Sequence, residues 1–289
     1  MSDTKKLIIL SVITVLLAGL FVVGISKSNS SYGMRTIKTV LLNPKYVESI
    51  DRISISNNSD SVELFKQNGK WYCKSEGINA FLNTKLLQEL LQLFTKQRTV
   101  YYISNKAKSW ENYGVDAENA HKVTFSDNNG NPIQTLYFGF SGFDEMNIYF
   151  RTEKTNTVYL TQDEFYSLLN TNILFWADMR ILPDYVFSIQ NDNVLGIRIY
   201  GKRLDNEKID TYMNKLVFLR FSALKERDDF NGIEPEKTVT IETTDKKLIL
   251  NFYRKNDTFL VDIDTGSGNY SKYCGEISRW TMNTIESLE

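Results

Sequence analysis

HKVTFSDNNGNPIQTLYFGFSGFDEMNIYFRTEKTNTVYL, residues 121–160, is the stretch of this 289-residue chain that decides its fold. Runs rich in β-branched and aromatic residues alternate there with the turn-forming residues Asn128-Asn129-Gly130 and Lys154-Thr155-Asn156. We therefore predict four strands, at residues 121–127, 133–140, 148–152 and 156–160. Because strands joined by short turns pair antiparallel, the stretch predicts a meander.

The residues around this meander predict a hairpin and two helices. Val62–Gln67 and Lys70–Cys73 flank Asn68-Gly69, the strongest short hairpin signal. A helix follows, with Asn83 or Thr84 as its cap. Its apolar face consists of Leu86, Leu87, Leu90, Leu91 and Phe94. After the meander, Thr161-Gln162-Asp163-Glu164 has the pattern of a capping box that opens a helix carrying Phe165, Leu168 and Leu169.

The same order of elements recurs in the second half of the chain. Val194–Ile199 corresponds to Ile50–Ile55, and a helical stretch at residues 212–225 corresponds to the leucine helix. A second meander is predicted at residues 239–243, 247–253 and 258–263. A last helix places Ile277, Trp280, Ile285 and Leu288 on one side. Two copies of a strand–helix–meander–helix unit are therefore predicted.

A long uncharged run stands before these units. Leu7–Ile25, LIILSVITVLLAGLFVVGI, is flanked by Lys5 and Lys6 and by Lys27. Since about 20 apolar residues span a bilayer as a helix, we predict an uncleaved membrane anchor, with a cleaved signal peptide as the alternative. The predicted fold class is α+β: an N-terminal transmembrane helix followed by two repeated antiparallel-sheet units with intervening helices. The predicted parts are a cytoplasmic stub and anchor (1–27), a tether (28–46), a first repeat (47–183) and a second repeat (184–289).

The charge balance and the cysteine count limit the classes of function. The chain has 34 Lys and Arg residues against 35 Asp and Glu residues, so no basic footprint for nucleic acid is predicted. No glycine-rich phosphate loop follows a strand, so nucleotide binding is not predicted either. Cys73 and Cys274 are the only cysteines, and one disulfide or two separate thiols both remain open.

The residues that suggest chemistry each have a structural alternative. Phe259–Gly268 runs from a strand into Asp264-Thr265-Gly266-Ser267, as in an aspartic protease. That mechanism needs two carboxylates, and only a homodimer would supply the second; a strand entering a glycine-rich turn is the alternative. His121 is the sole histidine, and no nucleophile elbow accompanies it. The sequence therefore predicts no catalytic, metal or cofactor site.

Several aromatic residues are candidates for an interaction surface. Consecutive aromatic residues in a strand point to opposite faces, so Tyr72 of Trp71-Tyr72 is a candidate for exposure. We select Tyr72, Trp110 and Tyr113, which can stack on a sugar or anchor a partner protein. The alternative is that these rings pack under a neighbouring helix.

One succession of motifs resembles a known family. It consists of Trp110, Tyr113-Gly114-Val115-Asp116, Leu136–Gly139, Tyr149–Arg151, Val158–Leu160 and Phe175–Arg180. This succession resembles the domain-of-unknown-function 4340 family. The resemblance implies a bacterial protein with an N-terminal membrane helix and α+β repeats outside the cytoplasm. It also implies an association with auxiliary components of ABC-type transporters, including those linked to gliding motility, and it attaches no catalytic residues.

From these observations we expect a non-enzymatic, single-pass membrane-anchored envelope protein. Its expected role is docking, or service as an accessory component, in an ABC-transporter-type membrane assembly. Its expected partners are membrane lipid through the N-terminal helix and other membrane or envelope proteins, with the C-terminal domain extracytoplasmic, either periplasmic or on the cell surface. The alternative is an extracytoplasmic module that binds a ligand or a glycan.

Overall fold

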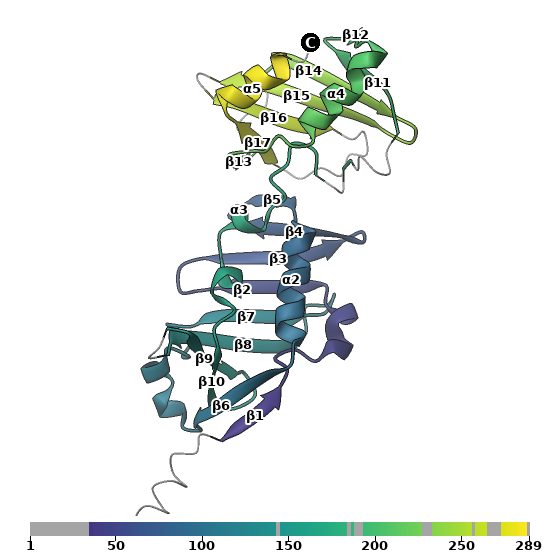
Figure 1. Cartoon of the computed structure of the whole chain (residues 1–289). Coiled ribbons are helices and arrows are strands. Elements are labelled where there is room, and N and C mark those ends of the chain that lie inside the picture. The colour runs from purple at the N-terminus through teal and green to yellow at the C-terminus, as the bar shows by residue number, and fades with distance from the viewer. Residues whose placement is uncertain are drawn as a thin grey trace, which may run out of the picture.

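The computed structural model describes residues 35–142, 145–183, 186–187, 193–226, 233–255, 258–264 and 273–287. In these residues the chain forms two antiparallel sheets and a few helices (Figure 1). The predicted mixture of helices with antiparallel sheets is therefore confirmed.

The first sheet lies within residues 36–162. Its strands are β1 (Thr36–Thr39), β2 (Arg52–Ser56), β3 (Ser61–Gln67), β4 (Lys70–Ser75), β5 (Ile78–Phe81), β6 (Arg98–Ser104), β7 (His121–Ser126), β8 (Pro132–Ser141), β9 (Asn147–Thr152) and β10 (Val158–Gln162). Their order across the sheet is β1-β6-β10-β9-β8-β7-β2-β3-β4-β5, and all neighbours pair antiparallel. The predicted meander is thus the centre of the sheet.

Local sequence explains the hairpin between β3 and β4. Gln67 pairs with Lys70, and the two residues between them both have positive φ, 51° at Asn68 and 77° at Gly69. Asn and Gly tolerate this backbone better than other residues, which is why the Asn-Gly signal predicted the turn correctly. The register places Val62 and Leu64 on the buried face of the sheet.

Helix α2 (Thr84–Thr95) covers one face of the first sheet (Figure 1). The Asn83 side chain accepts a hydrogen bond from the Lys85 N–H and caps the helix as predicted. Leu87, Leu90 and Phe94 are buried, and the Phe94 ring meets several phenylalanine rings edge to face. The apolar stripe of this helix therefore builds the core of the first sheet.

The second sheet lies within residues 194–277. Its strands are β11 (Val194–Ile199), β12 (Lys202–Arg203), β13 (Ala223–Glu226), β14 (Lys237–Thr243), β15 (Lys247–Lys255), β16 (Thr258–Asp264) and β17 (Tyr273–Ile277). Helices α4 (Asn206–Leu216) and α5 (Arg279–Glu286) lie on one face of it (Figure 1). Its strand order is β12-β11-β14-β15-β16-β17-β13. This order corresponds, strand by strand, to the run β3-β2-β7-β8-β9-β10-β6 of the first sheet.

One short segment joins the two sheets. It follows the 3-10 turn η4 (Tyr166–Leu169) and helix α3 (Ile173–Trp176). Ala177 forms an isolated antiparallel β-bridge with Leu82, the residue after β5. Three residues later, Arg180 forms a second isolated β-bridge, with Arg220. Beside these bridges, β5 contacts β13 and β17 of the second sheet, so the two sheets share one continuous hydrophobic core.

Several predicted boundaries were wrong. Residues 36–39 and 44–49, placed at the tether and its end, form β1 and the 3-10 helix η1 (Pro44–Ser49). The predicted helix at 212–225 begins earlier and ends at Leu216, because residues 223–226 pair with β17 as strand β13. Thr161 does not cap a helix, since it is a buried residue of β10 that pairs with Ile148.

In the predicted last helix, two of the four residues expected on its apolar side are placed otherwise. Ile277 ends strand β17, and the Trp280 side chain of α5 is exposed to solvent, whereas Ile285 is buried as expected. Leu288 lies outside the described residues.

The predicted membrane anchor Leu7–Ile25 also lies outside the described residues. No helix within the described ranges combines the length and the apolar character that a membrane span requires. The anchor therefore stays a prediction.

Candidate functional site

A polar hollow opens where two neighbouring strands of the first sheet separate. Strands β6 and β10 pair as far as Tyr101 and Leu160. Beyond this pair β10 continues beside β9, while β6 continues beside β1. The opening has a volume of about 460 Å³, and we call it the Arg98 hollow. Its lining includes Lys96, Arg98, Thr99, Tyr101, Met146, Asn147, Thr161, Gln162 and Glu164.

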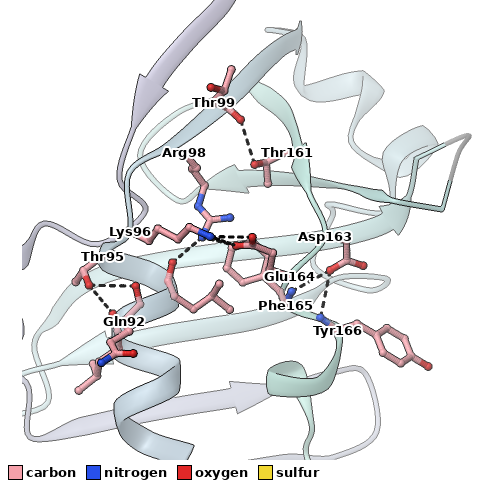
Figure 2. Close-up of polar contacts among 12 residues, drawn as sticks. Gln92, Thr95, Lys96, Arg98, Thr99, Thr161, Asp163, Glu164, Phe165 and Tyr166 are labelled. Carbon is pink, nitrogen blue, oxygen red and sulfur yellow. Dashed lines mark hydrogen bonds and ion pairs between the residues drawn. The ribbon is translucent and has the colours of Figure 1, made fainter.

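Arg98 is the most buried charged residue of this hollow. Its side chain is only 6% exposed, and its Nη2 donates a 2.6 Å hydrogen bond to the Leu93 carbonyl. The same Nη2 lies 3.8 Å from Glu164 Oε2, and the guanidinium lies 4.4 Å from the centroid of the Phe165 ring. Figure 2 shows the side chains of Arg98, Lys96 and Glu164 converging. Apart from this cluster, the Thr161 hydroxyl donates a hydrogen bond to the Thr99 carbonyl.

The position of Arg98 follows from the end of helix α2. The last four carbonyls of a helix lack partners within the helix. Here the Arg98 guanidinium donates a hydrogen bond to the Leu93 carbonyl. The Thr95 hydroxyl and the Lys96 N–H both donate to the Gln92 carbonyl. The Phe94 carbonyl accepts from the N–H groups of two residues before η1, Leu41 and Leu42. A cation at this end also complements the helix dipole.

One carboxylate, Glu164, pairs with both cations of the hollow, Lys96 and Arg98. Lys96 Nζ lies 2.9 Å from Glu164 Oε1, and Lys96 is well exposed whereas Arg98 is not. Burial lowers the pKa of the Arg98 guanidinium, and the nearby Glu164 carboxylate raises it by a smaller amount. Arg98 Nε is buried and has no hydrogen-bond partner among the described residues. The arrangement suits fixing α2 to β6 and β10 better than holding a charged ligand.

A second hollow lies on the other side of residues 163–166. It has a volume of about 510 Å³, and we call it the His121 hollow. Its lining includes His121, Phe140, Ser141, Asp163, Tyr166, Ser167 and Asn170. It combines exposed aromatic rings with hydroxyl and amide groups, which is a common composition for small-molecule sites.

A third hollow lies on the second sheet, between the end of α4 and α5. It has a volume of about 500 Å³, and we call it the Trp280 hollow. Phe218 is 80% exposed and Trp280 is 71% exposed there. The loop that carries Phe218 is fixed, because Leu219 accepts a hydrogen bond from Ile181 N–H at 3.0 Å.

The three predicted surface aromatics do not form one surface. Trp110 and Tyr113 lie on one loop that packs against the meander: Trp110 Nε1 donates to the Asn156 carbonyl, and the Tyr113 ring lies 4.7 Å from the Tyr149 ring. The Tyr72 ring of β4 stacks on Phe65 of β3 and on Phe81 of β5, and four strands separate β4 from β9 in the sheet. All three rings are half-buried.

Arg151 explains why Trp110 packs against the meander. The buried guanidinium lies 3.9 Å from the Trp110 ring centroid and 3.6 Å from the Tyr137 ring centroid. Its Nε donates to the Val115 carbonyl at 2.6 Å. Arg151 thus holds the 110–115 loop in place, a role that no local sequence signal indicated.

The remaining candidates also have structural surroundings. Asp264 ends strand β16, and the residues 265–268 that follow it lie outside the described residues. Cys73 and Cys274 are both buried and form no disulfide with each other. Burial raises the pKa of the Cys73 thiol to about 12, so this thiol stays protonated at neutral pH.

Comparison with known proteins places the chain in a family. The profile of the domain of unknown function DUF4340 matches residues 84–238, more than half of the chain. The chain belongs to the DUF4340 family. The DUF4340 match begins at α2 and ends in β14, so it contains the Arg98 and His121 hollows and Phe218.

The chain is also similar to a protein of Treponema pallidum (strain Nichols) that is named only as an uncharacterized protein. The two are 27% identical over 125 residues, which is 43% of this chain and 39% of the relative. The match thus spans less than half of either protein. No solved structure matches the chain.

Proposed function

We propose that the protein is a non-enzymatic, membrane-anchored envelope protein that docks another membrane protein, as an accessory component of an ABC-transporter-type assembly. The anchor is supported by the uncharged run Leu7–Ile25, and the extracytoplasmic orientation by the charged stub before it, since a signal-anchor begins in this way. The transporter association is supported by the family resemblance alone. The Trp280 hollow is the observation that carries the docking role.

The exposed rings of the Trp280 hollow are typical of a protein-binding surface. Large apolar side chains at a surface cost hydration free energy unless a partner covers them. Trp is also enriched among the residues that carry most of the binding energy at interfaces. Phe218 and Trp280 line the same concave surface, so one apolar segment can contact both.

The charges at this hollow indicate the chemistry of the partner. Its lining contains the exposed cations Lys215 and Arg220, and no carboxylate is found among the described residues of this lining. We therefore propose that the docked segment presents apolar side chains flanked by Asp or Glu, since opposite charges steer association and fix its register.

The arrangement of the two sheets suits a tethered docking protein. Strand β1, the first described strand after the predicted anchor, lies at the end of the first sheet that is remote from the second sheet (Figure 1). The Trp280 hollow lies on the second sheet. In the proposed orientation the shared core therefore holds the docking surface away from the membrane.

The two sheets have the architecture of an internal repeat. Seven strands of each sheet are equivalent, and we number them 1 to 7 in chain order: β2, β3 and β6–β10 in the first sheet, and β11–β17 in the second. Across both sheets these strands then follow the spatial order 3-7-6-5-4-1-2. Helices α2 and α4 are also equivalent, since each precedes the third strand. This agreement supports two copies of one α+β unit, at 47–183 and 184–289, with β4 and β5 as an insertion in the first.

The docking surface is tested by placing a photoreactive amino acid at position 218 of the full chain in native membranes. We expect ultraviolet light to produce a covalent adduct with a second membrane protein. Leu195 is the matched control, since it is an apolar residue of the same sheet and is 58% exposed but lies outside the hollow. Adducts of equal yield at both positions, or none at position 218, would refute the docking role.

A further inference from the structure

A β-bulge in β8 shapes the rim of the His121 hollow. The pairing of β8 with β9 shifts between Phe138 and Ser141, which marks a bulge. Gly139 lies within this bulge, directly against the backbone of Tyr113 and Gly114, where no side chain fits. Bulges redirect side chains and are frequent beside functional sites. The bulge here leaves Phe140, which is 49% exposed, and Ser141 in the wall of the hollow.

A second aromatic ring of the hollow belongs to Tyr166, the first residue of η4. Asp163 Oδ1 accepts hydrogen bonds from the N–H groups of Phe165, at 3.0 Å, and Tyr166, at 3.2 Å. The backbone at Tyr166 is therefore held, while its side chain is 85% exposed. Figure 2 shows this ring pointing away from the Arg98 cluster. An exposed ring on a held backbone contributes little to the core but is suited to stacking.

The hollow also contains an unsatisfied buried polar atom. His121 Nδ1 is buried and has no hydrogen-bond partner in the described structure. Buried polar atoms without partners are rare in folded proteins, and each calls for an explanation. Since this nitrogen has almost no accessible surface, a ligand hydroxyl group, which can both donate and accept, pairs with it once the His121 ring rotates toward the hollow.

The charge of the lining restricts the ligand. Among the described residues that line the hollow, Asp163 is the one carboxylate, and there is no Lys or Arg. A phosphate or carboxylate ligand would meet repulsion there without a compensating cation. The lining offers a neutral polar ligand the hydroxyl groups of Ser141 and Ser167 and the Nδ2 of Asn170, whose Oδ1 already accepts from the Asn172 N–H.

We propose that the His121 hollow binds a neutral saccharide. Tyr166 and Phe140 supply faces for the apolar C–H surface of a sugar ring, while Asn170, the hydroxyls and His121 bind its hydroxyl groups. This binding site lies on the first sheet, on residues separate from the Trp280 hollow, and it is independent of the proposed docking role.

The test is calorimetric titration of the full chain in detergent with a neutral oligosaccharide, the tetramer of N-acetylglucosamine. We expect saturable binding that Tyr166→Ala weakens at least about tenfold, since the aromatic contact is lost. Tyr46→Ala is the matched control: Tyr46 is also an exposed tyrosine, 41% exposed, but lies outside the hollow, and its loss leaves binding unchanged.

Position 121 provides a second, independent arm. His121→Asn keeps a hydrogen-bonding group near the place of Nδ1 and retains binding, whereas His121→Leu weakens it. Thermal unfolding of both variants verifies that they fold. No binding of the neutral tetramer, equal loss in the Tyr166 and Tyr46 variants, or preference for an acidic oligogalacturonate of the same length would each overturn the proposal. Photocrosslinking at position 218 is not affected by any of these results.

Discussion

Glu164 pairs with two cations in different surroundings, which allows a matched pair of substitutions. Arg98→Met removes a guanidinium that is 6% exposed, and Lys96→Met removes an ammonium that is 59% exposed. Methionine keeps an unbranched chain of similar length in both cases. The two variants thus remove one partner each from the same carboxylate.

The expected costs differ because Arg98 does more than pair with Glu164. Its loss removes the 2.6 Å hydrogen bond from the charged guanidinium to the part-buried Leu93 carbonyl, which costs roughly 1.5–3 kcal/mol. The attraction of the guanidinium for the Phe165 ring, 4.4 Å away, is partly replaced by a sulfur–aromatic contact. We expect Arg98→Met to destabilise the protein by about 2 kcal/mol. The exposed Lys96 pair contributes only about 0–1 kcal/mol.

Thermal unfolding followed by circular dichroism measures both variants. At about 2–4 °C per kcal/mol for a protein of this size, Arg98→Met lowers the midpoint by roughly 4–8 °C. Hydrogen exchange at the last turn of α2 then accelerates in this variant. Equal shifts in the two variants, or an unchanged midpoint for Arg98→Met, would refute the view that Arg98 fastens the end of the helix.

Three further predictions use features elsewhere in the fold. Burial raises the pKa of the Cys73 thiol to about 12 from an ordinary value of 9.0. The stability contributed by the protonated thiol is therefore full below pH 9 and is lost as the pH rises toward 12. Urea titration at each pH measures this loss: relative to Cys73→Val, the unfolding free energy decreases by up to about 1.4 kcal/mol per pH unit. Gly275→Ala places a methyl group inside the Phe221 ring and costs roughly 1–3 kcal/mol, whereas Gly196→Ala, with its nearest atom 3.6 Å away, changes the melting temperature little. Arg151→Lys loses the planar stack between two rings and exposes the 110–115 loop to limited proteolysis, and an unchanged digestion pattern would contradict this role.

Local chemistry predicted those elements that need no distant partner. The Asn68-Gly69 turn, the capped helix α2 and the central meander each follow from residues adjacent in the sequence. Thr161 shows the limit: a hydroxyl before Glu164 fits a helix cap, but pairing with β9 places it in a strand, where it donates to Thr99. Tertiary pairing overrode the local motif there.

Helix α4 was misplaced although its signal was present. Ile209, Tyr212, Met213 and Leu216 are buried at the spacing of one helix face, and that spacing marks the true helix. The apolar residues that follow extended the predicted helix into β13. An edge strand as short as this one, four residues, has no periodicity of its own to distinguish it.

The hollows themselves were beyond the reach of sequence reasoning. The Arg98 hollow joins residues 96–99 with residues 161–164, and only the pairing of β6 with β10 brings them together. Trp280 illustrates the same limit in the second sheet, since helical spacing placed it on the apolar side while the fold leaves it exposed. Which apolar residue remains uncovered depends on the neighbours of the helix, not on its sequence.

The central claim, a body held outside the membrane with its docking surface free, is tested most directly by thiol labelling in intact cells. A membrane-impermeant maleimide is applied to cells that make the full chain with Phe218→Cys or with Lys6→Cys. Both native thiols are buried, so the background is low. The account predicts labelling at position 218 in intact cells and at position 6 only after permeabilisation; labelling at position 6 alone in intact cells would contradict it.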